Sequence, residues 1–196
     1  MKQLALGISP PPQPTLDNFV PGANAELLGC LRQLRAGNYA ESVLYLWGEA
    51  GSGKSHLLLS CADAWRVADD VERLDEAGQI SLFNAINEAR ESGGAVLAAG
   101  NAPPAQLPLR EDLKSRLAWG LVYQLKPLSD EERSTYLRAE AARRGMQLPD
   151  EVVAWLLTRM RRDLRSLTAV LDQIDRTSLE QKRPITLPLV RDAVKA

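Results

Sequence analysis

The chain has 196 residues, a formal net charge of −1 and 45% hydrophobic residues. This length allows one domain, or one domain with a small second part, and the composition is typical of a globular protein with its own core. No run of about 20 apolar residues is present, and the N-terminus lacks the apolar stretch of a secretory signal. We therefore expect a cytoplasmic protein with no membrane contact. The small net charge gives no overall attraction to DNA or anionic lipid.

The pattern along the chain predicts an α/β part followed by a helical part. Apolar residues at helical spacing and short apolar runs alternate, which predicts helix 24–34, strand 42–47, helix 55–65, strand 66–70, helix 76–92, strand 95–99 and strand 121–125. After Pro127 no strand pattern remains. A capping box at Ser129 predicts a helix that ends at Gly145, and further helices are expected at 150–160, at 163–182 and from about 186.

This order of elements predicts three regions. Residues 1–14 contain Pro10, Pro11, Pro12 and Pro14, which favour an extended tail. Residues 15–126 are expected to form an α/β domain around a parallel sheet, and residues 127–196 an all-helical lid domain.

The segment GEAGSGKS, residues 48–55, matches the phosphate-loop pattern G-x-x-x-x-G-K-[ST] and lies between a predicted strand and a predicted helix. Its glycines let backbone N–H groups face a phosphate, and the helix N-terminus adds partial positive charge. Lys54 is expected to bridge the β- and γ-phosphates, and the Ser55 hydroxyl to coordinate Mg²⁺. We predict that ATP or ADP binds at Gly48, Gly51, Ser52, Gly53, Lys54 and Ser55; the alternative is a glycine-rich turn with a chance lysine.

Two later strand ends add polar residues. Asp69 is predicted to hold Mg²⁺ through water, and Asp70 to orient or deprotonate the attacking water. Asn101, after the next strand, is predicted to polarise the γ-phosphate or the water. Open α/β sheets bind ligands at the carboxyl ends of their strands, so these residues are expected beside the phosphate loop. The alternatives are a surface acidic pair and an ordinary loop asparagine.

The segments GEAGSGKS, ADDVERLD and AAGNAPPAQLPLREDLKSRLAWGLVYQLKPLSDEER resemble the DnaA-related AAA+ ATPase family, and within it the regulatory inactivators of DnaA, the Hda group. The resemblance covers most of 15–196 and is most specific around 108–133. It implies an AAA+ fold, with Arg116 as an arginine finger and Arg165 as the sensor 2 arginine of the lid. It also implies a base pocket lined by Asn18, Phe19 and Val20. Without the family, both arginines would be interpreted as solvated and Phe19 as a core residue.

The chain departs from the family pattern in two ways. Only 16 positions separate Lys54 from Asp70, which leaves room for one helix and one strand. The family has a further strand and helix there, about 20–30 residues at mean element lengths. Either that edge strand is absent or residues are missing from the sequence, and we favour missing residues. Many AAA+ ATPases also carry Glu where this chain has Asp70, which leaves intrinsic ATP turnover undecided.

The resemblance implies a regulator of replication initiation that inhibits re-initiation. It would bind ATP or ADP, dock on DnaA and insert Arg116 to trigger hydrolysis of DnaA-bound ATP. Direct origin recognition is not expected, because no basic recognition helix follows the lid and the isoelectric point is near 5.9. The alternatives are an autonomous ATPase that acts as a loader or motor, and a nucleotide-binding scaffold. Homo-oligomerisation is left open.

The first residues, MKQLALGI, resemble the short peptide by which such regulators hold the β sliding clamp of DNA polymerase III. Leu4, Leu6 and Ile8 would fill apolar pockets, and Gln3 would make an amide contact. The proline-rich spacer would then hold the ATPase domain near the clamp, so that DNA is reached only indirectly. The alternative is a disordered tail.

Overall fold

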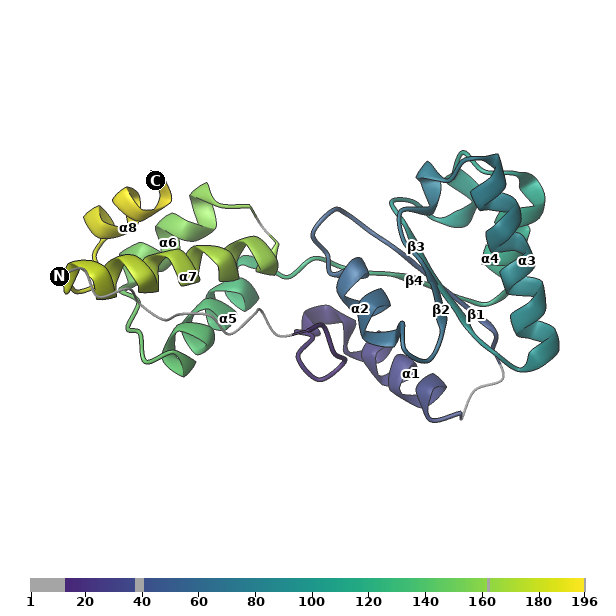
Figure 1. The fold of residues 1–196 in the computed structure, drawn as a ribbon, viewed down its shortest axis with the longest axis horizontal. Coiled ribbons are helices and arrows are strands. Elements are labelled where there is room, and N and C mark those ends of the chain that lie inside the picture. The colour runs from purple at the N-terminus through teal and green to yellow at the C-terminus, as the bar shows by residue number, and fades with distance from the viewer. Residues whose placement is uncertain (1–12, 38–40, 162, 196) are drawn as a thin grey trace. The chain divides into compact units, whose positions relative to one another are not determined.

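The computed structural model describes residues 13–37, 41–161 and 163–195 (Figure 1). They divide into two compact units: a first unit, Gln13–Pro127, and a second unit that begins at Leu128. The predicted clamp-binding residues Gln3, Leu4, Leu6 and Ile8 lie outside the described residues. In the part of the chain that the structure describes, no helix is both long and apolar enough to cross a membrane.

The first unit alternates helices and strands. After a 3₁₀ turn at Gly22–Asn24, its elements are α1 Ala25–Arg35, β1 Val43–Trp47, α2 Lys54–Cys61, β2 Arg66–Ala68, α3 Glu76–Ser92, β3 Val96–Gly100, α4 Glu111–Trp119 and β4 Leu121–Gln124. Helix α3 has its predicted bounds. Helix α2 ends four residues before its predicted end, because residues 62–65 form the turn into β2. The sequence interpretation did not include α4.

The strands form one parallel sheet in the order β2-β3-β1-β4, which confirms the predicted fold class. Helices α1 and α2 cover one face, and α3 and α4 the other (Figure 1). Alternate residues of β1 divide between the two cores: Leu44 and Leu46 pack toward α1 and α2, and Val43 and Tyr45 toward α3 and α4. A strand that is buried on both faces needs apolar residues at consecutive positions, and this explains the short apolar runs in the sequence.

The described sheet has four strands, and β2 lies at one of its edges. The described chain passes directly from α2 to β2, with no further strand or helix between Lys54 and Asp70, which agrees with the alternative that the edge strand is absent. A direct α2 crossover is feasible because about 10–12 residues suffice for such a connection. As an edge, β2 is largely exposed to solvent.

The second unit is helical throughout its described length. Its helices are α5 Asp130–Arg143, α6 Asp150–Arg159, α7 Leu164–Gln181 and α8 Leu187–Lys195. The predicted capping box is present: Ser129 Oγ accepts from the Glu132 N–H, and the Glu132 carboxylate accepts from the Ser129 N–H. The helices bury an apolar core of their own, to which each of them contributes leucine or valine side chains.

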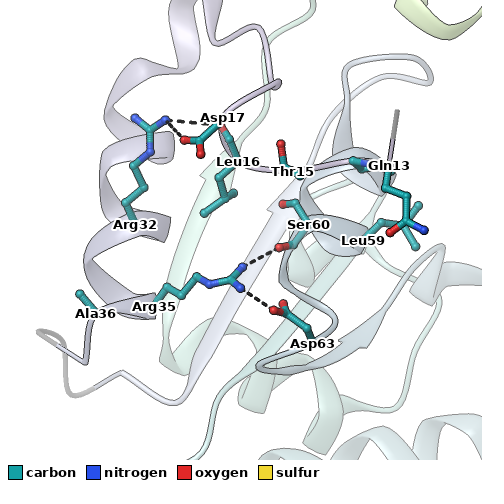
Figure 2. Close-up of a pocket in the computed structure, with 11 residues that line it drawn as sticks. Gln13, Thr15, Leu16, Asp17, Arg32, Arg35, Ala36, Leu59, Ser60 and Asp63 are labelled. Atoms are coloured by element: carbon teal, nitrogen blue, oxygen red, sulfur yellow. Dashed lines mark hydrogen bonds and ion pairs between the residues drawn. The ribbon is translucent and has the colours of Figure 1, made fainter. Parts of the chain in front are cut away.

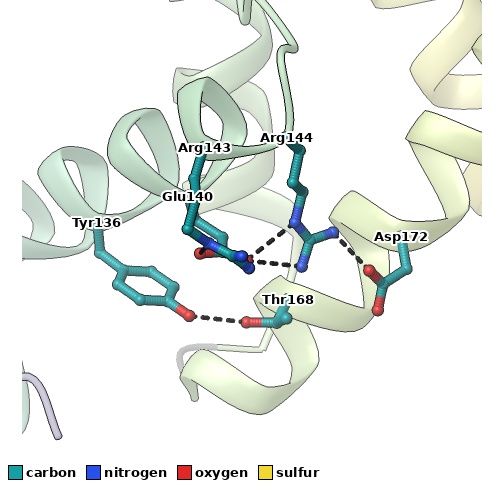
Figure 3. Close-up of polar contacts among 6 residues, drawn as sticks. All are labelled: Tyr136, Glu140, Arg143, Arg144, Thr168 and Asp172. Carbon is teal, nitrogen blue, oxygen red and sulfur yellow. Dashed lines mark hydrogen bonds and ion pairs between the residues drawn. The ribbon is translucent and has the colours of Figure 1, made fainter. Parts of the chain in front are cut away.

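A polar network also joins α5 to α7 (Figure 3). The Glu140 carboxylate accepts hydrogen bonds from Arg143 and Arg144, and Arg144 also bonds to Asp172. The hydroxyls of Tyr136 and Thr168 lie 3.0 Å apart. These donors hold the pKa of Glu140 below its ordinary value, mainly through Arg143, although partial burial opposes the shift.

Candidate nucleotide-binding site

The phosphate loop connects β1 to α2 through glycines in the left-handed region. Gly51 has φ +82° and Gly53 has φ +104°, values that L side chains rarely adopt. Helix α2 then begins at Lys54, so the free N–H groups of its first turn open toward the loop. Backbone donors and a helix N-terminus in this arrangement attract anions.

The surroundings of two loop side chains indicate that the loop suits an oxygen-rich anion. Lys54 is only 9% exposed, and its Nζ donates to the carbonyl oxygens of Gly48 (2.8 Å) and Glu49 (3.0 Å). Ser52 Oγ is buried and has no hydrogen-bond partner among the described residues. A buried hydroxyl without a partner costs about 1–3 kcal/mol, which an incoming phosphate oxygen would recover. The residues present therefore fit a nucleotide phosphate.

The predicted base-pocket segment lies against this loop. A Cβ atom placed on Gly53 would come within 2.8 Å of Phe19 Cε2, so the Phe19 ring covers the loop glycine directly. Phe19 is buried, and its ring centroid is 5.5 Å from that of His56 on α2. Asn18 exchanges hydrogen bonds with Thr15, and Val20 is half-buried.

A cavity of about 700 Å³ lies beside the start of the same segment, between residues 13–17, α1 and α2 (Figure 2). Its two arginines already have partners. Arg32 pairs with Asp17 at 3.0 Å, and Arg35 binds the Ser60 carbonyl and the Asp63 carboxylate. The phosphate loop does not line this cavity, which offers an anion no unpaired cation.

Strand register brings the predicted acidic and amide residues to the edge that carries the phosphate loop. Ala68 pairs with Ala98, and Trp47 with Gly100, so Asp69, Asn101 and Gly48 all follow the carboxyl ends of neighbouring parallel strands. Asp69 and Asn101 are exposed. Ligands of open parallel sheets bind at this edge, so the side chains of Asp69 and Asn101 are available to contact a ligand bound there.

Asp70 is exposed and has φ +47°, an uncommon conformation for a residue other than glycine. Its N–H donates to Asp69 Oδ1 at 2.9 Å, and its carboxylate lies 3.5 Å from Arg73. The described residues contain no group of three or more His, Cys, Asp or Glu side chains suited to a metal. A Mg²⁺ ion would depend on Ser55, Asp69 and the nucleotide itself.

The sequence interpretation missed two side chains near Asn101, those of Tyr45 and Glu72. Tyr45 Oη donates to the Ala102 carbonyl at 2.7 Å, and burial, with Glu72 nearby, raises the pKa of this phenol. Glu72 Oε2 is buried without a hydrogen-bond partner among the described residues. A Cβ atom on Gly100 would lie 2.3 Å from Tyr45 Oη, so only glycine fits at the end of β3. That glycine, directly before Asn101, was the available signal.

Asn24 was also missed. It is 5% exposed; its Nδ2 donates to the carbonyls of Pro21 and Lys126, and its Oδ1 accepts from the Lys126 N–H. It joins the segment that carries Phe19 to the end of β4. A contact across about a hundred residues leaves no local pattern in the sequence.

The two predicted arginines lie in different units. Arg116 is in the last turn of α4 in the first unit, with its guanidinium carbon 3.6 Å from the centroid of the Trp119 ring. Arg165 is exposed in the first turn of α7 in the second unit, two residues after the helix cap Asp163. The nucleotide contact of Arg165 stays a prediction.

Comparison with known proteins agrees with this architecture. Residues 130–194 match the family model described as "Hda, lid domain". Domain III of the replication initiation protein DnaA from Thermotoga maritima superposes with a TM-score of 0.78 at 22% identity, over 95% of this chain and 98% of that one.

Two further solved structures share the fold. AMPPCP-bound DnaA from Aquifex aeolicus has a TM-score of 0.70 at 20% identity, over 83% of this chain and 65% of that chain. The Thermotoga maritima RuvB Holliday junction branch migration motor has a TM-score of 0.68 at 18% identity, over 94% and 72%. Residues 130–194 are thus similar to the lid domain of Hda, and the chain shares the fold of domain III of DnaA and of RuvB.

Proposed function

We propose that the chain binds an adenine nucleotide at the phosphate loop. The loop glycines, the buried ammonium of Lys54 and the partnerless hydroxyl of Ser52 support this binding. AMPPCP is bound by the DnaA from Aquifex aeolicus that shares the fold. In the bound state, Lys54 would exchange its loop carbonyls for phosphate oxygens, and Phe19 would face the base. Bound Mg²⁺ would neutralise charge on the phosphate oxygens.

We further propose that the protein regulates replication initiation by acting on DnaA. In this role it docks on ATP-bound DnaA and supplies Arg116 to the nucleotide of its partner. Charge accumulates on the γ-phosphate oxygens during hydrolysis, and an arginine supplied in trans accelerates such reactions by about 10³–10⁵. Hydrolysis would convert DnaA to its ADP-bound form and prevent re-initiation.

The observation that carries this proposal is the lid match. A lid of the Hda type, over 130–194, follows a body with the fold of DnaA domain III. The environment of Arg116 adds support. Its neighbours are the aromatic rings of Trp119 and Phe83, and its Nε has no hydrogen-bond partner in the described chain. An arginine neutralised by a carboxylate would be a poorer phosphate ligand.

The test is hydrolysis of ATP preloaded on DnaA, measured with and without this protein and with the sliding clamp loaded on DNA. The wild-type protein should accelerate hydrolysis, and Arg116→Ala should abolish the acceleration while its own ADP affinity stays unchanged. Arg90→Ala, on the neighbouring helix, is the matched control. Unchanged acceleration by Arg116→Ala would contradict the arginine-finger role.

The geometry also supports a second function, that of an autonomous ATPase. Asp69, Asn101 and the phosphate loop lie at one sheet edge, as an autonomous ATPase requires. Such a protein would act as a loader or motor. RuvB, which has a similar fold, is named a Holliday junction branch migration motor. Rapid ATP turnover by the purified protein alone, lost in Lys54→Ala and unaffected by DnaA, would favour this function over the first.

Tethering to the sliding clamp is a separate part of the proposal. It rests on Gln3, Leu4, Leu6 and Ile8, which lie outside the described residues. The double variant Gln3→Ala with Leu6→Ala should lose clamp binding in a pull-down and retain its affinity for ADP. Clamp affinity equal to that of the wild type would exclude this tether.

A further inference from the structure

The guanidinium of Arg116 lies between aromatic rings at the end of α4. Its carbon is 3.6 Å from the centroid of the Trp119 ring and 5.2 Å from that of Phe83 on α3. Trp119 follows Arg116 by three positions, a spacing that brings side chains together on a helix surface. A guanidinium held over an aromatic face is attracted by the quadrupole of the ring.

The usual partner for a helical arginine is engaged elsewhere. Asp112 lies one turn before Arg116, at the distance from which a carboxylate pairs with an arginine. Instead, its Oδ2 accepts from Arg110 at 2.7 Å, and its Oδ1 accepts from the Leu113 N–H at 2.8 Å. Arg116 is therefore held by rings rather than by a negative charge, and its positive charge is not cancelled.

We propose that Trp119 is a positioning residue for Arg116, a role that rests on the proposed function of Arg116 as an arginine finger. The ring lies against the guanidinium carbon and leaves the terminal NH₂ groups, which have no hydrogen bond or ion pair among the described residues, to donate to phosphate oxygens. A carboxylate would occupy those same N–H groups. Trp119 thus orders a long side chain before a partner's nucleotide arrives, which lowers the entropy lost on docking.

Trp119 also contacts a second arginine. Arg90 of α3 lies 4.9 Å from the centroid of the same ring, and Trp119 is 52% exposed. Arg90 therefore offers a matched control, since its removal takes a cation from the ring and leaves the contact with Arg116 in place. Arg90 is expected to be dispensable.

The experiment is a double-mutant cycle on the acceleration of DnaA-bound ATP hydrolysis. Trp119→Leu should lower the maximal acceleration by about threefold to tenfold, as expected for loss of a cation–π contact, with the half-maximal protein concentration unchanged. Trp119→Phe should retain most of the activity, because it keeps an aromatic face. Arg90→Ala should have little effect, and Trp119→Leu should still lower the rate in that background. In the Arg116→Ala background, Trp119→Leu should have no effect.

The ring contact has a readout that does not depend on DnaA. In protein labelled with ¹⁵N-arginine, the Arg116 Nε–H resonance, assigned with Arg116→Lys, should be shifted upfield by the ring in the wild type and in Trp119→Phe. The shift should be lost in Trp119→Leu. Equal ADP affinity and melting temperature of the variants would show that the fold is retained.

The outcomes separate the two proposals. If Arg116→Ala leaves the acceleration intact, the proposed finger fails, and with it the positioning role. If Arg116→Ala abolishes acceleration but Trp119→Leu does not lower it, only the positioning role is overturned. A Trp119→Leu effect confined to the half-maximal concentration would mean that Trp119 is a docking contact, and this too would overturn the proposal.

Discussion

In the first unit, Ser52 Oγ and Glu72 Oε2 are buried without a hydrogen-bond partner among the described residues, whereas in the second unit the carboxylate of Glu140 accepts bonds from two arginines. The first unit also holds the buried ammonium of Lys54 on backbone carbonyls rather than on an acid. A buried polar atom without a hydrogen-bond partner lowers the stability of the fold unless a ligand supplies the partner. This difference is consistent with the nucleotide proposed for the phosphate loop, whereas Glu140 in the second unit is satisfied by side chains of its own unit.

The largest expected effect falls on the core of the second unit. Leu156 of α6 is fully buried, so Leu156→Ala should lower the free energy of unfolding by about 2–5 kcal/mol. Urea denaturation monitored by circular dichroism would measure the loss. Leu179→Ala, at a side chain that is 62% exposed, should change stability by less than about 0.5 kcal/mol. Equal losses in the two variants would mean that this core does not stabilise the unit.

The next effect concerns the ligand of the first unit. Lys54→Ala should weaken ADP binding by roughly 10- to 150-fold, since a hydrogen bond to a charged group contributes about 1.5–3 kcal/mol. Isothermal titration calorimetry would measure the affinity. The control is Lys114→Ala, because Lys114 of α4 pairs with Glu111 and lies outside the phosphate loop. If both variants bind ADP as the wild type does, the phosphate loop is not the nucleotide site.

A pH titration tests the network of the second unit. Since Arg143 and Arg144 depress the pKa of Glu140, its contribution to stability is present above the ordinary pKa of glutamate and is lost as pH falls through the lower folded value. Glu140→Gln should therefore lower stability by about 1–2 kcal/mol at pH 7 and by less near pH 3. Chemical denaturation at both pH values would measure it. The control is Glu180→Gln, which should change stability little because Glu180 is exposed. A pH-independent loss in Glu140→Gln would contradict the ion-pair explanation.

The smallest expected effect is a gain. Lys182 follows α7 with φ +51°, a conformation that costs an L residue about 1 kcal/mol and glycine very little. Lys182→Gly should therefore raise the melting temperature slightly. Gly145→Ala is the reverse experiment: Gly145 has φ +73° and no atom near its Cβ position, so a lower melting temperature would report the backbone cost alone. A lower melting temperature in Lys182→Gly would contradict the strain.

Local patterns were sufficient for most of the fold. Helix α3 keeps its predicted bounds because its ends carry local signals: the Asp75 side chain caps its first turn, and Gly93, in the left-handed region, follows its last residue. The phosphate loop was recognised for a similar reason, since one short segment contains the strand end, the glycines and the lysine. Helix α4 was missed because Arg110, its N-cap residue, makes no side-chain capping bond that the sequence could signal.

The site depends more on tertiary contacts. No local pattern places Phe19 on Gly53, or Asn24 against Lys126, because these residues are distant in the chain. The contact of Trp119 with Arg116 is different, since the three-residue spacing on a helix could have revealed it. The roles of Arg116 and Arg165 came from the family resemblance and not from the physical pattern, and they remain proposals.

The short edge strand β2 has a consequence for the behaviour of the protein at high concentration. An exposed sheet edge can pair with the edge of another molecule and begin intermolecular aggregation. Strand β2 is three residues long, which gives an incoming chain few backbone groups to pair with. Its first residue, Arg66, places a charge at this edge and is held there by Glu88 at 2.7 Å. The β2 edge of the described sheet is thus protected from edge-to-edge association.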